Sequence, residues 1–323
     1  MSKMLITGGA GFIGLSLARH FLGKGYPVDI IDNFSRGNDD VELREFAENK
    51  NTNLLNLDLL NIDSYRKLDK DYEYIFHLAA IIGVQNVLNK PYSVLKDNVL
   101  MLTNVIDYAR SNSRLKRLLF ASTSEVYAGT LKFFSLPLPT PENTPIALTE
   151  LEHPRTSYML SKIYGEALCQ QSGIPFTIFR PHNIYGPRMG MSHVIPELLK
   201  KCVEATSGKL PVYSTSHKRT FCYIDDAVNM ISNAAMMEEC RNQTLNVGSL
   251  EGEITIENLA KIVIKTVGKE MLIEPMPETP GSPTRRCPDM SKTTILTGYK
   301  PVVSVEDGVR KTYEWYKENV FRN

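Results

Sequence analysis

The sequence predicts an α/β protein, with a Rossmann-type, doubly wound parallel sheet and a smaller mixed α/β substrate-binding lobe. Short apolar segments alternate with helical patterns through the first half of the chain, which is typical of parallel strands covered by helices. A glycine-rich turn joins the first apolar segment to the first helical one. We therefore expect a dinucleotide-binding domain over residues 1–180, to which part of 220–250 returns, and a substrate-binding lobe over residues 181–323.

The expected strands are short and mostly apolar: Met4–Thr7, Val28–Ile31, Asn53–Asn56, Tyr74–Leu78, Leu118–Ser122 and Phe176–Phe179. Helical spacing of apolar residues is clearest over Phe12–Gly23, Pro91–Arg110 and Ser157–Gln171. The proline-rich segment Gly129–Thr156 predicts a long ordered loop, and loops of that length in compact domains are usually functional. Ligands should bind at the carboxyl ends of the strands.

The turn after the first strand carries Gly8, Gly11 and Gly14 in a Gly-x-x-Gly-x-x-Gly pattern. Gly8 permits the turn, Gly11 lets the backbone approach a diphosphate, and Gly14 lets helix and strand pack closely. The diphosphate then sits at the positive end of the helix. Any tight strand-to-helix turn can use such glycines, so the assignment depends on its context.

That context is Asp32, which ends the second apolar segment eighteen residues after Gly14. A carboxylate at this position accepts hydrogen bonds from a ribose 2′-hydroxyl and repels a 2′-phosphate. The sequence therefore predicts NAD rather than NADP as the cofactor. Arg36 nearby weakens the exclusion of the phosphate.

Composition places the chain among ordinary globular proteins, with 323 residues, 42% of them hydrophobic, and a net charge of +1. The near-neutral balance argues against a nucleic-acid partner. No stretch approaches the roughly 18 apolar residues of a membrane span, so we expect no membrane partner.

Cysteine and histidine usage predicts neither disulfides nor a metal site. The five cysteines are widely spaced, with no Cys-x-x-Cys pair, and the chain starts without a signal-peptide pattern. Both features favour reduced thiols and a cytoplasmic location. The six histidines never fall at ligand spacing with carboxylates or thiols.

Tyr158 and Lys162 form a Tyr-x-x-x-Lys motif, whose spacing places both side chains on one helix face. An adjacent ammonium lowers the pKa of a phenol from its ordinary value of about 10, and an oxidised nicotinamide adds a further positive charge. Tyr158 would then take a proton from a substrate hydroxyl while hydride leaves the same carbon. Solvent-facing helix residues also produce this spacing, but Thr123 follows a preceding strand and supplies a hydroxyl to the same site.

Together the motifs resemble the extended short-chain dehydrogenase/reductase family, specifically its NAD-dependent nucleotide-sugar epimerases, dehydratases and decarboxylases. The resemblance spans essentially the whole chain and rests on Gly8–Gly14, Leu57–Leu59, His77–Ala80, Asn98, Thr123, Tyr158, Lys162, Arg180–Arg188, Arg219, Tyr223–Asp226 and Arg285–Asp289.

The resemblance implies a role for each matching residue. Four would carry the chemistry: Thr123, Glu125, Tyr158 and Lys162. The NAD contacts would be Gly8, Gly11, Phe12, Ile13, Gly14, Asp32, Asn33, Asp58, Leu59, Leu78, Ala79, Ala80, Asn98, Tyr158 and Lys162. The nucleotide-sugar contacts would be Ser124, Asn183, Arg188, Arg219 and Arg286. A homodimer through Pro91–Arg110 and Ser157–Gln171 is also implied.

Physical chemistry supports the arginines separately, because guanidinium groups pair bidentately with diphosphate oxygens. For any one of them a surface salt bridge is the alternative. We expect His182 to be structural rather than catalytic.

The family shares an opening oxidation, usually at C4 of the sugar, and members differ in what the ketone does next. Here Ser124-Glu125 stands where 4,6-dehydratases carry an Asp-Glu pair, so their leaving-group acid is missing. Thr-Ser-Glu at 123–125 is closest to UDP-glucuronate decarboxylases, which makes decarboxylation of UDP-glucuronate the leading hypothesis. A UDP-hexose 4-epimerase, then a 4,6-dehydratase, then a non-catalytic NAD sensor are the alternatives.

Two departures from the family pattern stand out. Thr123 and Tyr158 are separated by 35 residues, about ten more than family members usually have, so we expect Gly129–Thr156 to be a specialised substrate lid. Ser214–Lys218 replaces the family's Gly-Asp-Gly, and Thr220 replaces an aspartate. That region normally meets the base, so the identity of the nucleotide stays open.

Overall fold

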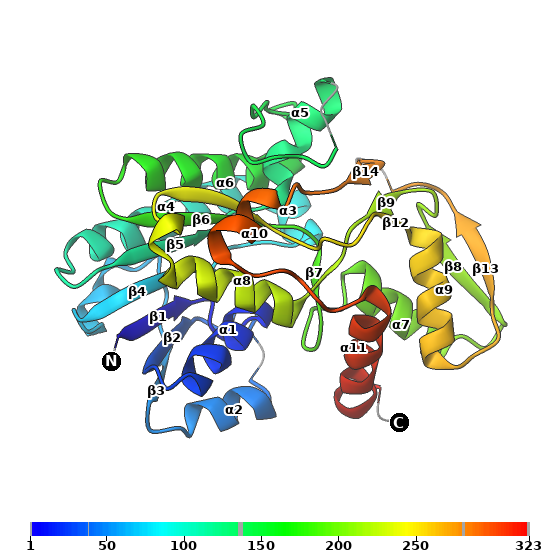
Figure 1. Ribbon diagram of the computed structural model, residues 1–323, viewed down its shortest axis with the longest axis horizontal. Coiled ribbons are helices and arrows are strands. Elements are labelled where there is room, and N and C mark those ends of the chain that lie inside the picture. The colour runs from blue at the N-terminus through cyan, green and yellow to red at the C-terminus, as the bar shows by residue number, and fades with distance from the viewer. Residues whose placement is uncertain (1, 38, 135–137, 280–281, 322–323) are drawn as a thin grey trace.

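The computed structural model describes residues 2–37, 39–134, 138–279 and 282–321. The centre of this part is a seven-stranded parallel sheet with the order β11-β6-β5-β4-β1-β2-β3 (Figure 1). Its strands are β1 (Lys3–Thr7), β2 (Val28–Asp32), β3 (Thr52–Asn56), β4 (Tyr72–His77), β5 (Arg117–Ala121), β6 (Phe176–Pro181) and β11 (Gln243–Val247). The strand order reverses between β1 and β4, which is where doubly wound sheets bind their ligands.

Helices cover both faces of this sheet. Neighbouring residues of β1 point to opposite faces, so Ile6 belongs to one core and Leu5 to the other. The core with Ile6 is covered by α1 (Phe12–Gly23) and α8 (Ile224–Met236), which pack on each other. The core with Leu5 is covered by α4 (Pro91–Arg110), which packs against α6 (Pro154–Gln171).

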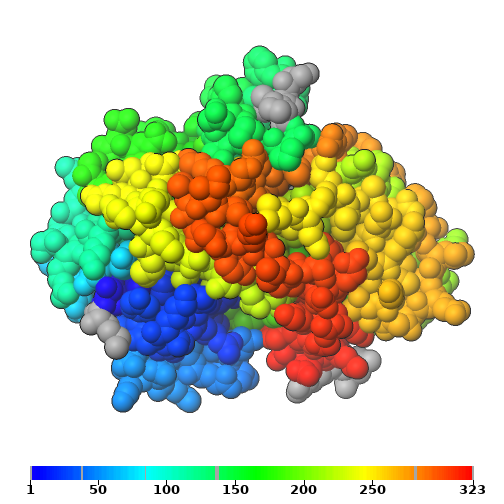
Figure 2. Space-filling view, viewed as in Figure 1, coloured from blue at the N-terminus to red at the C-terminus, as the bar shows by residue number. Residues whose placement is uncertain are grey.

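Smaller helices connect the strands of this domain. They are α2 (Val41–Ala47), α3 (Val84–Asn89), α5 (Ala128–Phe133) and the 3-10 turns η1 (Ile62–Lys67) and η2 (Ser124–Tyr127). The segment Gly129–Thr156 is therefore not a plain loop, since it begins inside α5 and ends inside α6. Figures 1 and 2 show α5 standing out from the body of the molecule. Pro137 lies outside the described residues.

The start of α6 also differs from the prediction. The helix begins at Pro154 rather than Ser157, because proline suits the first turn of a helix and the His153 ring accepts a hydrogen bond from the Arg155 N–H. Tyr158 thus lies in the second turn. The predicted strands correspond to β1 to β6, with ends shifted by one or two residues.

The smaller lobe is mixed α/β, as expected. Its helices α7 (Val194–Glu204), α9 (Ile256–Val267) and α11 (Val305–Asn319) pack together beside the parallel pair β8 (Lys209–Tyr213) and β13 (Leu272–Met276). Short strands build the side nearest the main sheet: β7 (Ile184–Tyr185) with β10 (Cys222–Tyr223), and β12 (Ile254–Thr255) with β9 (Lys218–Arg219) and β14 (Arg285–Arg286).

The chain crosses between the two parts several times. After β14 it runs back to α10 (Ser291–Thr297), which packs on β11 and α8, before it enters α11 (Figure 1). A last 3-10 turn, η3 (Glu238–Cys240), precedes β11. In the described part of the chain, no helix has the length and apolar character needed to cross a membrane.

Candidate active site

The carboxyl ends of β1, β2, β4 and β5 surround a cavity of about 850 Å³. Residues from the smaller lobe, including Asn183, Arg188 and Arg286, line its other side. The cavity therefore lies at the position predicted from the strand order, between the sheet and the lobe.

Close packing of the protein's own backbone requires glycine at positions 8 and 14 of the glycine turn. Gly8 has a φ of +69°, and a Cβ there would lie 2.8 Å from the Ala79 nitrogen. A Cβ on Gly14 would lie 2.2 Å from the Gly8 oxygen, so that helix and strand approach as closely as predicted. No side chain caps the first turn of α1, which leaves its N–H groups for a diphosphate.

Asp32 faces the same cavity at the end of β2. Its carboxylate accepts hydrogen bonds from Ala10 N at 3.1 Å and Phe34 N at 2.9 Å. These contacts fix the carboxylate beside the glycine turn, where it can meet a ribose. The other predicted cofactor residues that line the cavity are Gly11, Phe12, Ile13, Asn33, Asp58, Leu59, Leu78, Ala79 and Ala80.

Asn98 does not line this cavity but supports it from α4. Its side chain exchanges two hydrogen bonds with the backbone of Ile81, at 2.7 and 3.1 Å, and donates to Ser161 Oγ at 3.3 Å. Asn98 thereby ties the turn after β4 to α6, the helix that carries Tyr158 and Lys162.

Tyr158, Lys162 and Thr123 meet at the cavity wall, as the motifs predict. The Lys162 Nζ lies 5.8 Å from the centroid of the Tyr158 ring, so both side chains occupy one helix face. Lys162 is buried, and its Nζ donates to the Ala121 carbonyl at 2.7 Å.

The pKa of Tyr158 does not follow the prediction made from Tyr-x-x-x-Lys. Burial and the negative charge of Glu125 raise it above the ordinary value, although a hydrogen bond with Thr123 and the charge of Arg36 act in the opposite direction. The expectation that Lys162 lowers the pKa of Tyr158 is therefore wrong. The Lys162 ammonium donates its hydrogen bond to the Ala121 carbonyl and not to Tyr158. Burial lowers the pKa of Lys162 to about 8.

Glu125 and Arg286 form an ion pair across the cavity, with Arg286 Nη2 2.9 Å from Glu125 Oε1. Arg286 Nη1 also donates to Ser124 Oγ at 3.3 Å. The guanidinium lowers the pKa of the Glu125 carboxyl, so this carboxyl is ionised at neutral pH. Three residues that the family resemblance singled out are thus in mutual contact.

Arg188 is engaged elsewhere. Its Nε lies 2.7 Å from Asp40 Oδ2, and its Nη2 donates to the Ala10 carbonyl at 3.4 Å. Arg188 therefore joins the smaller lobe to the glycine turn. It lines the cavity beside the cofactor residues rather than beside Arg286.

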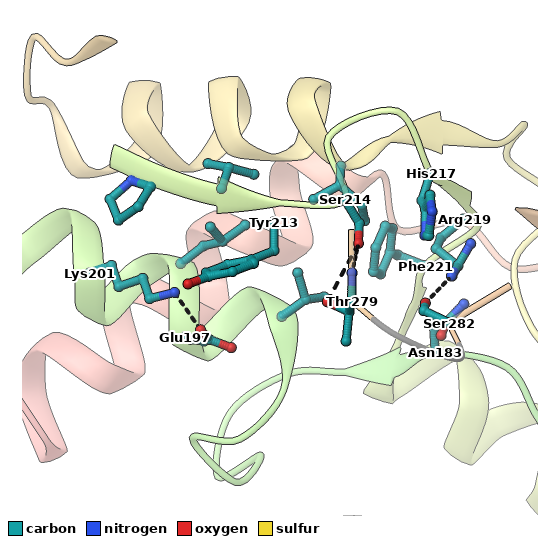
Figure 3. A pocket seen from close by; sticks show the side chains of 15 residues that line it. Asn183, Glu197, Lys201, Tyr213, Ser214, His217, Arg219, Phe221, Thr279 and Ser282 are labelled. Atoms are coloured by element: carbon teal, nitrogen blue, oxygen red, sulfur yellow. Dashed lines mark hydrogen bonds and ion pairs between the residues drawn. The ribbon is translucent and has the colours of Figure 1, made fainter. Parts of the chain in front are cut away.

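A second cavity, of about 260 Å³, opens within the smaller lobe (Figure 3). Asn183 lines both cavities and has a left-handed φ of 43°, held by a hydrogen bond from its side chain to the Thr220 carbonyl at 2.9 Å. Arg219 lines the smaller cavity and donates to Ser282 Oγ at 2.9 Å. Figure 3 shows these side chains together with Tyr213, Ser214, His217 and Thr279.

Sequence reasoning missed a buried ion pair that involves α6, the helix that carries Tyr158 and Lys162. Glu166 and Arg180 are joined at 2.6 and 2.8 Å, with both side chains 5% exposed. Glu166 also accepts a hydrogen bond from Ser122 Oγ at 2.5 Å. The signal was available, since Glu166 follows Lys162 by four residues on the same helix. Met189 and His193, which also line the large cavity, were missed as well.

The fold and the site together define a dinucleotide-dependent enzyme whose cavity wall carries Tyr158 and Lys162. Residues 4–248 match the NAD dependent epimerase/dehydratase family, and the chain belongs to this family. The family assignment confirms the resemblance, the Rossmann-type fold and NAD as the cofactor.

Individual relatives agree with this assignment. The chain is 32% identical to the UDP-N-acetyl-alpha-D-glucosaminuronate decarboxylase of Bacillus cytotoxicus, over 98% of each chain. It is 31% identical to the UDP-glucuronic acid decarboxylase 1 of Danio rerio, over 98% of this chain and 73% of the relative. The structure of the UDP-glucuronic acid 4-epimerase from Bacillus cereus, solved with UDP-glucuronic acid and NAD, superposes with a TM-score of 0.83 at 27% identity, over 98% of this chain and 99% of that one. The chain is thus an NAD-dependent enzyme that modifies nucleotide sugars, and the non-catalytic alternative is set aside.

Proposed function

We propose that this enzyme decarboxylates a UDP-hexuronate, with UDP-glucuronate as the leading substrate. The observation that carries the proposal is the Glu125–Arg286 pair, 2.9 Å apart beside Ser124. A guanidinium pairs well with a carboxylate, which is the group that separates a hexuronate from a hexose. An epimerase of neutral hexoses has no carboxylate for Arg286 to hold.

The chemistry begins with oxidation at C4. When bound, NAD accepts hydride from C4 and can later return it. Tyr158 takes the proton of the C4 hydroxyl, and Thr123 donates a hydrogen bond to the same oxygen. Tyr158 must already be ionised to accept this proton, and the positive charge of a bound oxidised nicotinamide would lower its pKa. Lys162 would hold its own positive charge 5.8 Å from the Tyr158 ring centroid.

The C4 ketone makes the C6 carboxylate part of a β-keto acid. The C5–C6 bond breaks, CO2 leaves, and its electron pair moves into the C4 carbonyl to give an enolate. A proton then adds to C5. Because Glu125 is ionised, this proton comes from water, which the Glu125 carboxylate beside Thr123 would hold toward C5. Arg286 orients the carboxylate before it leaves as CO2.

Contacts to the rest of both ligands complete the proposal. The glycine turn, Asp32 and Asp58 would hold NAD, and the smaller cavity would hold the nucleotide of the substrate. Arg219 would face the diphosphate from there. Arg188 also lines the large cavity while its guanidinium pairs with Asp40, and its contact with the nucleotide sugar stays a proposal.

Epimerisation at C4 is the second candidate, favoured by the likeness to a UDP-glucuronic acid 4-epimerase. A 4,6-dehydratase is the third candidate. It is less favoured because position 124, where such enzymes carry an acidic residue, is Ser124 in this chain. The 32% identical relative also brings UDP-N-acetylglucosaminuronate into the set of substrates to test.

One experiment separates these reactions. The purified enzyme with NAD is incubated separately with UDP-glucuronate, UDP-N-acetylglucosaminuronate and UDP-glucose, and product masses are measured. We expect a uronate to lose the mass of CO2. Loss of the mass of water would indicate dehydration, and an unchanged mass with a new anomeric NMR signal would indicate epimerisation. Either result in place of CO2 loss would reject the decarboxylase assignment.

We also propose a homodimer through α4 and α6. Support comes from large apolar side chains that these helices expose: Tyr92 is 73% exposed, Tyr164 52% and Leu100 42%. Light scattering after gel filtration should give twice the chain mass, and Tyr164→Glu should shift the protein toward the monomer. A monomeric wild type at micromolar concentration would contradict this proposal.

Two further assignments remain proposals. Free thiols at all five cysteines support a cytoplasmic location, which cell fractionation would test. A division of the chain near residue 180, with part of 220–250 returning to the first domain, is supported by β11 at the edge of the main sheet. If this division is correct, residues 1–180 expressed alone should fold poorly, because β6 would lose β11, one of its two neighbours.

A further inference from the structure

The two members of the Glu125–Arg286 pair come from separate parts of the fold. Glu125 lies in the 3-10 turn η2 after β5, and Arg286 lies in β14 of the smaller lobe. Their separation of 2.9 Å depends on how these two segments are held relative to each other. No backbone hydrogen bond is found between η2 and β14 in the described part of the chain. Something else must fix the distance.

One fully buried amide contacts both segments. Asn246, in β11, is 0% exposed. Its Oδ1 accepts a hydrogen bond from Tyr127 Oη at 2.9 Å, and Tyr127 belongs to η2, two residues after Glu125. The His182 Nε2 lies 3.1 Å from the same oxygen.

The other end of the amide holds the segment after Arg286. Asn246 Nδ2 donates to the Asp289 carbonyl at 3.1 Å and to the Thr140 carbonyl at 3.0 Å. Thr140 in turn forms a backbone bridge to the same segment, since its N–H donates to the Cys287 carbonyl at 2.8 Å and its carbonyl accepts from Asp289 N at 2.9 Å. Asn246 and Thr140 thus clamp the residues directly after Arg286.

The segment 140–142 is anchored from a third direction. Glu142 Oε1 accepts a hydrogen bond from the backbone N–H of Asn246 at 2.8 Å, and the Glu142 carbonyl accepts from Arg180 Nη1 at 3.0 Å. The long connection between Thr123 and Tyr158 therefore makes buried contacts with other parts of the fold. Part of it lies between β11 and the segment that follows Arg286.

We propose that Asn246 is a positioning residue that sets the distance between Glu125 and Arg286. The proposal rests on the proposed function, in which this pair acts on the substrate carboxylate. An amide supplies one acceptor and two N–H donors in a fixed plane, and here all of them are used. Asp at this position would turn an oxygen toward two carbonyls, and an apolar residue would leave buried polar groups unpaired.

The test compares variants at the clamp with matched variants far from it. Asn246→Asp removes both side-chain donors. Tyr127→Phe removes the link to η2, together with the hydrogen bond that Tyr127 Oη accepts from Arg180 Nη1 at 2.7 Å. Asn112→Asp is the control for the first, because Asn112 is 4% exposed and its side chain also donates to a buried carbonyl, that of Tyr72. Tyr108→Phe is the control for the second, because the Tyr108 hydroxyl donates to the Asp69 carbonyl.

Two rates are measured for each variant with the substrate that the wild type converts: formation of NADH in a single turnover, and release of final product. We expect Asn246→Asp to slow product release about 10- to 100-fold and Tyr127→Phe about 3- to 10-fold, while NADH formation stays within about twofold. Both controls should leave both rates unchanged. A parallel fall in both rates would indicate a merely structural role and would overturn the proposal.

A double-mutant cycle separates this proposal from the proposed function. If Asn246 acts through the pair, Asn246→Asp should cause no further loss of turnover in an Arg286→Ala background, whichever reaction the wild type catalyses. Additive losses, or no loss in either single variant, would refute the positioning role. The product mass from the wild type alone decides between decarboxylation and epimerisation, so each idea can fail without the other. If Asn246→Asp does not fold, the same cycle is run with Tyr127→Phe.

Discussion

Lys162 Nζ lies 2.7 Å from the carbonyl oxygen of Ala121, at the end of β5, and donates a hydrogen bond to it. The same ammonium lies 4.9 Å from the centroid of the Phe120 ring. The Lys162 ammonium is therefore held by the Ala121 carbonyl rather than by the hydroxyl oxygen of Tyr158. Its burial lowers the pKa of Lys162 from 10.5 to about 8.

This burial predicts a pH dependence of stability. Between pH 8 and 10.5 the unfolded chain binds a proton at Lys162 that the folded chain has released. The free energy of unfolding should therefore rise with pH in this window, by about 1.4 kcal/mol per unit, relative to Lys162→Met. Urea unfolding of both proteins across this range measures the difference. Parallel curves would show that burial does not shift this group.

Replacing Tyr158 by Phe removes one oxygen from the cavity wall. Turnover should fall by about 10²- to 10⁴-fold, because Tyr158 is the group proposed to take the substrate proton. NAD affinity, measured by calorimetry, should change little. Tyr164→Phe, on the exposed side of the same helix, is the control and should keep full activity. A Tyr158→Phe enzyme with more than a tenth of wild-type turnover would exclude Tyr158 as the base.

Asp32→Ala should reduce the preference for NAD over NADP. The variant loses the carboxylate that repels a 2′-phosphate, and it loses hydrogen bonds to Ala10 N and Phe34 N. We expect NAD affinity to fall about tenfold and NADP affinity to rise. Melting shifts with each cofactor report both changes, and Asp63→Ala, an exposed residue of η1, is the control. An unchanged ratio would mean that Asp32 does not select the cofactor.

Glu166→Ala should lower the free energy of unfolding, because Glu166 is buried and paired with Arg180. It leaves the Arg180 guanidinium buried without its carboxylate, which typically costs about 3–5 kcal/mol. Glu204→Ala, which breaks an exposed pair with Lys200, should cost less than about 1 kcal/mol. Chemical denaturation of the three proteins gives both values. Equal small losses would show that the buried pair is dispensable.

The sequence predicts the cofactor half of the site well, because that half is built from local patterns. Gly8 and Gly14 lie within one turn, and Asp32 ends the neighbouring strand, so spacing alone brings them together. Tyr158 and Lys162 share a face for the same reason, since they are four residues apart on a helix. The direction of the pKa shift at Tyr158 was mispredicted, because burial and the charge of Glu125 come from other segments.

The structure of the segment Gly129–Thr156 could not be predicted from local sequence patterns. Its prolines predict a loop, yet it contains most of α5, and its role at Thr140 and Glu142 depends on partners in β11 and after β14. None of the described residues between 129 and 156 lines the large cavity, so the structure gives this segment no contact expected of a lid.

The sequence by itself determined the fold and the cofactor, since both follow from local patterns: the alternation of strand and helix segments, and the spacing of the glycines and Asp32. The class of enzyme followed from the resemblance of its motifs to a known family. Tertiary structure alone decided which distant groups meet: Arg286 reaches Ser124 across 162 residues, Asn246 reaches Thr140 across 106, and Arg188 pairs with Asp40 across 148. Such contacts carry no local period, because they depend on how the two lobes and the connections between them pack.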